Sequence, residues 1–404
     1  MAKRRKQVHL YYLDAEVQDL CTGMHRLGMR VDEGCRAAHE AVQTAEAAKQ
    51  LRQIHAQQPS LNPNSHTQLR ALLFEDWALP PHNYTLAGEP STDAATIRNL
   101  LVNPLVDEDQ KSLLKAVKGY RRAEKLLSTY LRKLAPGAGV TTTEGYVHPD
   151  YNSAGTVTGR LSSSNPNFQN IPFVLRDMFI PPPGCVFVGA DYDQLELRFA
   201  AALSGAESYL AVFEKQFIDP HNLTADLMFG DAFWSAAGAP DTKMGKGTGQ
   251  FKRLRNLAKT ICFASLYGAA PKKVHEIIGQ EEDERGNMLY AELDLRQVRT
   301  LHRKWLERAP EFKAWWKQTN YRVQAGAFTV VARAMVELVK HLPFDFGQRT
   351  GLVNQLHDAV LFSIPESRAE YARAIITETL TTKAEGLPVT FTAEAEIGDT
   401  WKDC

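Results

Sequence analysis

The chain has 404 residues, which is too long for one ordinary core and predicts two or three subdomains. Hydrophobic residues make up 44% and the formal net charge is +0, which argues against wholesale disorder and, on average charge alone, against a nucleic-acid partner. Five scattered cysteines without a CxxC pair, no signal peptide and no bilayer-spanning apolar run exclude a disulfide framework and a membrane protein. These features indicate a reducing, cytoplasmic location.

The first third of the chain is predicted to be mostly helical. Apolar residues at helical spacing run from about residue 13 to 57, with an interruption near Gly28. A long helix is predicted over about 109–134. Its segment 111–133 carries eight Lys or Arg against one acid, Glu124, so the neutral average hides a cationic surface that is compatible with phosphate binding.

The middle of the chain contains a strand that ends in a carboxylate. Residues 186–190 are predicted to form a buried strand that runs directly into Asp191, and the helix that follows brings Gln194 and Glu196 nearby. A strand that turns into a helix in this way projects its last carboxylate from the rim of a sheet. Acids at strand ends are common, so a carboxylate without a metal is the alternative for this segment taken alone.

From about residue 206 to 340 the pattern is helical again, and one segment places cations and aromatic rings on a single face. Arg255, Lys259, Phe263 and Tyr267 are spaced four apart, and each four-residue step on a helix drifts by only about 40°. Two cations followed by two rings can hold a triphosphate at one end and a base at the other. The alternative is an amphipathic helix with its apolar half in the core. A basic block without any acid precedes and overlaps this face: Lys243, Lys246, Lys252, Arg253, Arg255 and Lys259.

The last part of the chain is predicted to form a hairpin and an edge strand. Residues 352–364 form two apolar runs with His357 and Asp358 at the turn, and 389–397 alternates like an edge strand. A carboxylate at a hairpin turn can meet one on an adjacent strand. Two such carboxylates can hold two divalent ions roughly 3.5–4 Å apart, as in-line phosphoryl displacement requires. A His-Asp turn without a metal is the alternative for this segment alone.

Together and in this order, the segments resemble the polymerase domain of family A DNA polymerases, the bacterial DNA polymerase I class that includes many phage enzymes. The resemblance covers nearly the whole chain. DYDQLELR from Asp191 resembles the family's DYSQIELR, RNLAKTICFASLYG from Arg255 resembles the RxxxKxxxFxxxYG helix, and QLHDAVLF from Gln355 resembles QVHDELVF. TGRLSSSNPNFQNIP, at 158–172, is nearly the family's primer–template loop as it stands.

The resemblance implies an α+β right-hand fold with an antiparallel palm sheet and a helical thumb and fingers. It places mostly thumb in 1–150, palm in 151–205, fingers in 206–318 and the rest of the palm in 319–404. The implied activity is template-directed addition of dNTPs to a primer 3′-hydroxyl by two-metal transfer. Primer–template DNA and dNTPs are the implied partners of an expected monomer, with a separate exonuclease or processivity protein as further candidates.

The resemblance also implies roles for individual residues. Asp191 and Asp358 would be catalytic and would bind two Mg²⁺ ions, which Mn²⁺ can replace, together with the main-chain carbonyl of Tyr192. Glu196 would be the steric gate that leaves no room for a ribose 2′-hydroxyl. The residues implied to contact the dNTP are Gln194, Glu196, His221, Arg255, Lys259, Phe263 and Tyr267. Those implied to contact DNA are Arg160, Gln169, Asn170, Asn320, Gln324 and His357.

Departures from the family pattern keep two alternatives open. Ala359 stands where the family usually has Glu, which predicts slower turnover, and Asp193 replaces a usual Ser. A weakly active or non-catalytic polymerase-like DNA-binding protein is therefore one alternative, and a single-subunit RNA polymerase or primase-like enzyme is the other. The chain begins where the polymerase domain begins, so we expect no proofreading exonuclease on it and a phage-like source.

A further departure lies between Pro310 and Met335, where the chain is shorter than the family pattern. Counting back from Met335 places Asn320 and Gln324 on the family's Asn-x-x-x-Gln motif. A rival alignment instead places Thr319 and Gly326 on the approach to a hairpin, so the assignment of this segment stays open.

Overall fold

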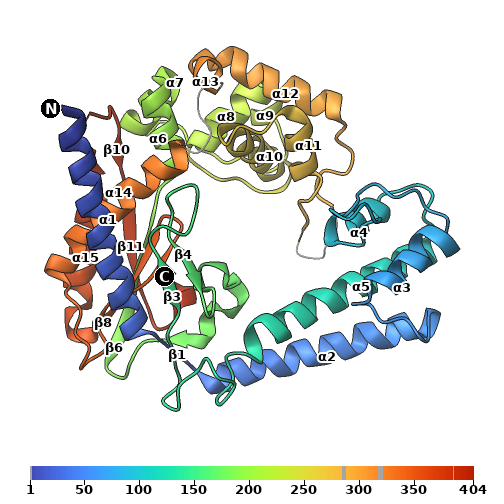
Figure 1. The fold of residues 1–404 in the computed structure, drawn as a ribbon. Coiled ribbons are helices and arrows are strands. Elements are labelled where there is room, and N and C mark those ends of the chain that lie inside the picture. Colours follow the sequence, from blue (N-terminus) through green and yellow to red (C-terminus); the bar gives the residue numbers. More distant parts are fainter. Residues whose placement is uncertain (1, 284–287, 317–321, 385) are drawn as a thin grey trace. The chain divides into compact units, whose positions relative to one another are not determined.

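The computed structural model describes residues 2–283, 288–316, 322–384 and 386–404 of the chain (Figure 1). The chain forms two compact units. The larger unit consists of Met1–Arg30, Tyr146–Gly279 and Glu292–Cys404, and the smaller of Val31–Gly145 and Gln280–Ala291. Helices and strands are both present and largely segregated, so the predicted α+β class is confirmed. Among the described residues, no helix has the length and apolarity that a membrane span requires.

The larger unit is built around a four-stranded antiparallel sheet with the order β11-β6-β8-β7. Its strands are β6 Cys185–Tyr192, β7 Gly351–Leu356, β8 Ala359–Pro365 and β11 Ala393–Gly398. β6 and β8 are apolar and mostly buried, as expected for central strands that are rich in Val, Phe and Leu. β11 alternates buried and exposed residues along most of its length, which confirms the predicted edge strand.

Helices cover parts of this sheet. Helix α15 Ala369–Leu380 contacts β11 and β6, and α1 Ala2–Leu27 contacts β7. Helix α14 Arg322–His341 packs on α1, α15 and α6 Leu195–Ser204. Helix α1 ends at Leu27, and the next residue, Gly28, has a φ of +64° that favours glycine; this is the predicted interruption. A small three-stranded sheet has the order β2-β1-β5 and consists of β1 Met29–Val31, β2 Tyr146–Val147 and β5 Phe179–Ile180. Shorter pairs join β3 Asp150–Asn152 to β4 Ser162–Ser164 and β9 Thr382–Lys383 to β10 Thr390–Phe391.

A second group of helices in the larger unit packs around α10. They are α7 Glu207–Lys215, α8 Pro220–Phe229, α9 Asp231–Trp234, α10 Gly249–Leu266, α11 Pro271–Ile278, α12 Leu295–Arg308 and α13 Pro310–Trp316. α10 packs on α8 and α11, and α12 packs on α8 and α11. A buried polar pair helps to fix this core, because the Trp305 indole donates to the Tyr209 hydroxyl at 3.0 Å.

The smaller unit is built on a pair of long helices that pack together, α2 Glu33–Gln57 and α5 Glu108–Leu126. Helix α5 continues as a wider helical turn over Leu127–Leu131. Shorter elements complete the smaller unit: α3 His66–Arg70, a wide turn over Ala71–Asp76, and α4 Ala94–Leu101. Both long helices begin at an aspartate cap, Asp32 and Asp107, whose side chains accept from main-chain N–H groups. Part of its core consists of Ile54, Leu61, Leu69, Leu72, Leu113, Ala116 and Val117.

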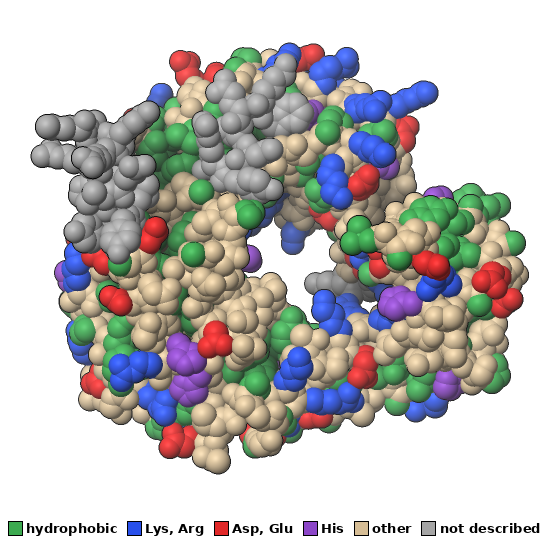
Figure 2. Space-filling model, in the orientation of Figure 1, with side chains coloured by type: hydrophobic (Ala, Val, Ile, Leu, Met, Phe, Trp, Pro, Cys, Tyr) green, Lys and Arg blue, Asp and Glu red, His purple; other side chains and the backbone are tan. Residues whose placement is uncertain are grey.

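One segment of the smaller unit comes from a distant part of the chain. Residues 280–291 lie between α11 and α12 in sequence but belong to the smaller unit. The Glu282 carboxylate lies 2.5 Å from Lys118 Nζ on α5 and 3.9 Å from Arg98 Nε on α4. The predicted finger segment 206–318 is therefore divided between two compact units. On the face drawn in Figure 2, Lys and Arg side chains are interspersed with Asp and Glu, in keeping with the balanced net charge.

Candidate active site

The strand register brings the two predicted catalytic carboxylates to one edge of the sheet. Asp191 lies near the end of β6 and is paired with Ala359 of β8. Asp358 immediately precedes Ala359 in the two-residue turn that joins β7 to β8. The other turn residue, His357, has a φ of +57°. The Asp191 and Asp358 side chains are within hydrogen-bond reach of one another. The proximity predicted from the sequence is therefore present.

The charge state of Asp191 depends on this proximity. Loss of hydration near the strand end, followed by the charge of Asp358 and a hydrogen bond with it, raises the pKa of Asp191 from 3.8 to about 7. The charge of Asp193 adds to this effect. The Asp191 residue is nevertheless exposed to solvent on one side of the strand end, so a cation can reach its carboxylate. Two carboxylates this close repel each other unless a proton or a cation lies between them, so the pair is suited to bind cations.

The site offers oxygen atoms that can act as metal ligands. A small cavity of about 90 Å³ adjoins Asp191, and most of its other lining residues are apolar, among them Leu356, Val360 and Trp401. Carboxylate and carbonyl oxygens are the ligands that Mg²⁺ and Mn²⁺ prefer, so the donor set fits a divalent ion. Tyr192, whose main-chain carbonyl was predicted as a ligand, is the last residue of β6.

The segment after β4 supports the turn that carries Asp358. Gln355 of β7 donates from Nε2 to the main-chain oxygen of His357 at 2.6 Å. Gln169 in turn donates from Nε2 to the main-chain oxygen of Gln355 at 3.4 Å. Gln169 and Asn170 both lie in the short helix Phe168–Asn170. The structure thus links Gln169, through Gln355, to the turn that contains His357.

The turn after β6 positions Glu196. Gln194 adopts a left-handed conformation with a φ of +48° at the residue before α6, and its side chain makes no capping hydrogen bond there. Arg198 fixes this turn by donating to the main-chain oxygens of Asp193 at 2.8 Å and Thr390 at 2.7 Å. Glu196, in the first turn of α6, is only 8% exposed. The turn that Arg198 holds in place therefore positions Glu196 directly after β6.

Two side chains hold the Glu196 carboxylate. Arg160 donates to one of its oxygens, and the hydroxyl of Tyr267 donates to the other. Burial raises the pKa of Glu196, and the charge of Arg160 opposes that effect. Glu196 therefore connects the loop before β4 with the end of α10, which brings three predicted site residues together.

The remaining predicted nucleotide residues cluster between α8 and α10. The His221 ring centroid lies 5.7 Å from that of Phe263, and the Phe263 ring lies 6.3 Å from Tyr267. Lys259 is exposed, with Nζ 5.9 Å from the centre of the Phe263 ring. His221 is 4% exposed, and its Nδ1 has no hydrogen-bond partner among the described residues. The rings and Lys259 lie together as the four-residue spacing predicted.

Arg255 has a partner that sequence reasoning missed. Its Nη2 donates to both carboxylate oxygens of Asp219, at 2.8 and 2.9 Å, and both side chains are 9% exposed. Asp219 also caps α8 by accepting from the main-chain N–H groups of His221 and Asn222. The Asp-Pro sequence at the helix start could have identified Asp219 as a cap. No sequence signal links it to Arg255, which lies 36 residues away.

Two of the predicted DNA contacts receive no further support. Gln324 lies in the first turn of α14, which contacts α1, α6 and α15. Gly326 lies within the same helix, so the rival alignment's hairpin approach is not present at this residue. Asn320 and Thr319 lie outside the described residues.

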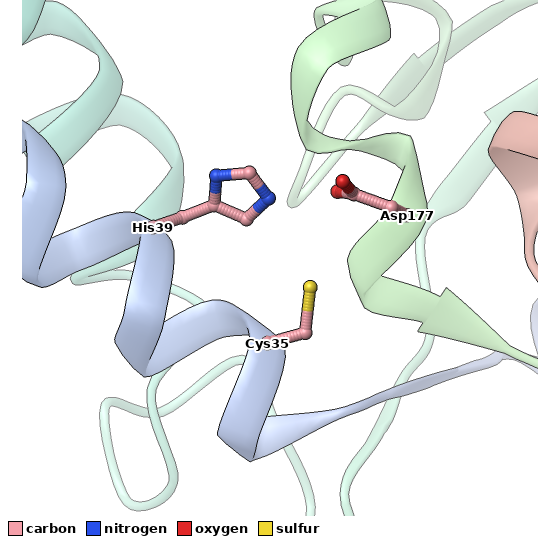
Figure 3. Close-up of side chains that lie close together, drawn as sticks. All are labelled: Cys35, His39 and Asp177. Atoms are coloured by element: carbon pink, nitrogen blue, oxygen red, sulfur yellow. The ribbon is translucent and has the colours of Figure 1, made fainter.

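A separate group of possible metal ligands does not define a site. Cys35 and His39 are one turn apart on α2, and Figure 3 shows them with Asp177. Asp177 belongs to the larger unit, whereas Cys35 and His39 belong to the smaller one. Within the larger unit, Asp177 already accepts from Lys402 Nζ at 3.0 Å. We therefore assign no metal to these three residues.

Comparison with known proteins identifies similar chains. The model of the family described as "DNA polymerase family A" matches residues 35–310 and 311–403. DNA polymerase I from Chloroflexus aurantiacus is 29% identical over 433 residues, which cover 98% of this chain and 43% of the relative. The thermostable DNA polymerase I from Thermus aquaticus is 31% identical over 421 residues, or 94% of this chain and 46% of the relative. The chain thus spans less than half the length of these bacterial relatives, which give no support to the expected phage-like source.

A solved structure shares the fold. The POL domain of Pol1 from M. smegmatis, in complex with DNA primer-template and dNTP, matches with a TM-score of 0.75. The match covers 96% of this chain and 70% of that chain at 19% sequence identity. At this identity the likeness shows the fold alone, and the fold agrees with the expected polymerase architecture.

Proposed function

The chain belongs to DNA polymerase family A, and on this premise we propose that it is a template-directed DNA polymerase that adds dNTPs to a primer 3′-hydroxyl. The observation that carries the proposal is the pair Asp191 and Asp358 at one edge of the antiparallel sheet. Paired carboxylates in this arrangement serve in-line phosphoryl displacement. The proposal assigns the palm to this sheet, the fingers to the helices around α10 and the thumb to the smaller unit.

Family A polymerases use divalent metal ions. We assign their ligands to Asp191, Asp358 and the main-chain carbonyl of Tyr192, and the ions to two Mg²⁺, which Mn²⁺ can replace. When bound, these ions lower the pKa of the primer hydroxyl and neutralise charge on the triphosphate. The primer 3′-hydroxyl gives up its proton to solvent, its oxygen forms a bond to the α-phosphorus in line, and the bond to the departing pyrophosphate breaks; Asp191 and Asp358 would hold the ions at this centre.

The neighbouring side chains bind and select the nucleotide. Lys259, Arg255 and His221 face the triphosphate, and Phe263, Tyr267 and Gln194 line the sugar and base. Glu196 is the steric gate against a 2′-hydroxyl, and its two hydrogen bonds keep it in place. Primer–template DNA is assigned to Arg160, Gln169, Asn170, His357, Asn320 and Gln324.

The direct test is extension of a labelled DNA primer on a longer template, with each dNTP or NTP supplied separately. We expect templated addition of dNTPs that requires Mg²⁺ and is lost when EDTA removes it. Failure with every nucleotide, despite tight binding of primer–template, would favour a DNA-binding relative weakened by Ala359. Addition of NTPs without a primer would instead favour a primase-like enzyme.

Substitution of the carboxylates tests the metal assignment. We expect Asp191→Ala and Asp358→Ala each to abolish extension while leaving primer–template binding within about twofold of the parent chain, because neither residue is assigned to DNA. Binding is measured by fluorescence anisotropy in EDTA. Persistent extension by either variant would contradict the assignment of that carboxylate.

A further inference from the structure

The loop that joins α9 to α10 is fastened to the start of α8. The Asn222 side chain is fully buried and donates from Nδ2 to the main-chain oxygens of Lys243 and Gly245, each at 2.8 Å. The main-chain N–H of Asp219 also donates to the Lys243 oxygen, at 3.1 Å. Lys246 directly follows Gly245. These contacts place Lys246 beside the first turn of α8, which carries His221.

Cations from different elements converge on His221. Burial first, and then the charges of Lys259, Arg255 and Lys246, lower the pKa of His221 to about 3, against an opposing effect of Asp219. Lys259 and Arg255 lie on α10, whereas Lys246 lies on the preceding loop. The buried His221 Nδ1 has no partner among the described residues. This buried ring nitrogen is therefore available for a hydrogen bond with a bound polar group.

The cations around His221 differ in how far they are already paired with a carboxylate. Arg255 already shares two hydrogen bonds with the buried carboxylate of Asp219, so its charge is largely compensated. Lys246 is exposed, and no carboxylate in the described part of the chain pairs with it. A triphosphate carries several negative charges and needs cations that are not already neutralised. Lys259 and Lys246 fulfil that requirement better than Arg255 does.

We propose that Lys246 is a further ligand of the nucleotide triphosphate, supplied by the α9–α10 loop and positioned by Asn222. The inference rests on the proposed polymerase function and extends it to a residue outside the family's RxxxKxxxFxxxYG helix. Lys246 binds phosphate oxygens alongside His221 and Lys259, so the α9–α10 loop increases the affinity of the chain for dNTP. The sequence placed Lys246 only within a general basic block.

The same loop supplies a matched control. Lys243 is also exposed and lies three residues earlier, but its Nζ is 5.5 Å from the centre of the Trp234 ring. A Lys243→Gln variant removes the same charge from the same loop without touching the proposed contact. Lys246→Gln removes the contact, and Lys246→Arg keeps its charge.

The test measures equilibrium binding of dNTP to the full chain, without primer, for the parent chain and the three variants. We expect Lys246→Gln to raise the Kd for dNTP and for inorganic tripolyphosphate by about fivefold. Lys243→Gln should change either Kd by less than about twofold, and Lys246→Arg should restore most of the lost affinity. If the two Gln variants raise Kd equally, Lys246 contributes only a general positive charge and the proposal is wrong. The proposal is also wrong if Lys246→Gln leaves both Kd values unchanged.

Primer extension separates this inference from the function on which it rests. In a chain that extends primers, Lys246→Gln should raise KM for dNTP and leave kcat within about twofold. If the parent chain extends primers but its KM is insensitive to Lys246→Gln, the inference fails and the function stands. If the parent chain binds dNTP through Lys246 but never extends a primer, the proposed function fails and the site stands.

Discussion

The Glu196 carboxylate is held from both sides by Arg160 and Tyr267, and this arrangement predicts its role in sugar selection. A side chain fixed by two hydrogen bonds cannot move aside easily for a 2′-hydroxyl. We expect Glu196→Ala to lower the preference for dNTP over the matching NTP by about 100-fold, because the clash disappears. The measurement is the ratio of kcat/KM values in primer extension.

Tyr267→Phe refines this prediction. The variant keeps the ring but removes the hydroxyl that donates to Glu196, so selectivity should fall by less than in Glu196→Ala. Unchanged sugar preference in Glu196→Ala would remove the gate role. The four-residue pattern indicated that Tyr267 lies near the nucleotide. Its bond to Glu196, 71 residues away, was not predictable.

His221 predicts an acid sensitivity of the fold. Its pKa in the native state is about 3, compared with 6.5 for an unperturbed histidine, because burial and neighbouring cations disfavour the protonated ring. Below pH 6.5 the unfolded chain therefore binds a proton that the native chain does not. The free energy of unfolding falls as pH decreases from about 6.5 toward 3, and the stabilising effect is fully present above 6.5.

A His221→Gln substitution removes the group that binds this proton in the unfolded chain. Between pH 7 and pH 5, we expect the parent chain to lose about 2 kcal/mol more stability than the variant does. Urea unfolding at both pH values provides the measurement. His302, whose pKa burial also lowers, remains in both proteins and cancels from the difference. Equal pH dependence in the two proteins would contradict a buried neutral His221.

At the scale of elements, α5 shows how one basic helix divides its charges. The sequence predicted a cationic surface over 111–133, but several of these cations have protein partners. Lys118 pairs with Glu282, and Arg121 donates to the main-chain oxygens of Pro63 at 2.7 Å and Thr92 at 2.5 Å. Arg122, one residue later, is exposed. We therefore expect Arg121 to stabilise the fold and Arg122 to be available for contact with phosphate groups.

We expect Arg122→Ala to weaken DNA binding by about threefold to tenfold and to reduce the salt slope by about one, as loss of a phosphate contact does. Arg121→Ala should instead destabilise the fold by about 1–3 kcal/mol, because two main-chain oxygens lose their donor. Anisotropy titrations at several salt concentrations and urea unfolding distinguish the two. The reverse pattern would show that the exposed face of α5 does not contact DNA.

At the scale of the whole molecule, the segment 280–291 shows that chain order and compact units do not coincide. It leaves the larger unit after α11, contributes Glu282 to the smaller unit and returns before α12. The carboxylate lies near Lys118 and Arg98, and all three side chains are about one-fifth exposed. This partly buried ion cluster joins a late segment to α4 and α5.

We expect Glu282→Ala to destabilise the smaller unit by about 1–2 kcal/mol, because two cations lose a shared partner. Amide hydrogen exchange should become faster in α4 and α5 and stay unchanged in β6 and β8. Glu108→Ala is the control, since Glu108 and its partner Lys111 lie three residues apart on α5 and form an ion pair within that helix. Unchanged exchange in α4 and α5 would contradict a stabilising role for the segment.

The sequence by itself determined the elements and the chemical groups of this protein. Periodicity predicted a strand ending in Asp191, a turn carrying Asp358, and a helix with Arg255, Lys259 and Phe263 on one face. Local spacing dictates these features because the helix and strand periods are properties of a few consecutive residues. The motifs that resemble family A DNA polymerases added the family to which the chain belongs.

Only the tertiary structure decided which groups meet. It paired Asp191 with Ala359, gave Arg255 the buried partner Asp219, and placed residues 280–291 in the smaller unit. Such contacts join residues tens to hundreds of positions apart, and they depend on register and helix packing. A single sequence carries no local signal for either, because packing is a property of surfaces that come together only in the folded chain.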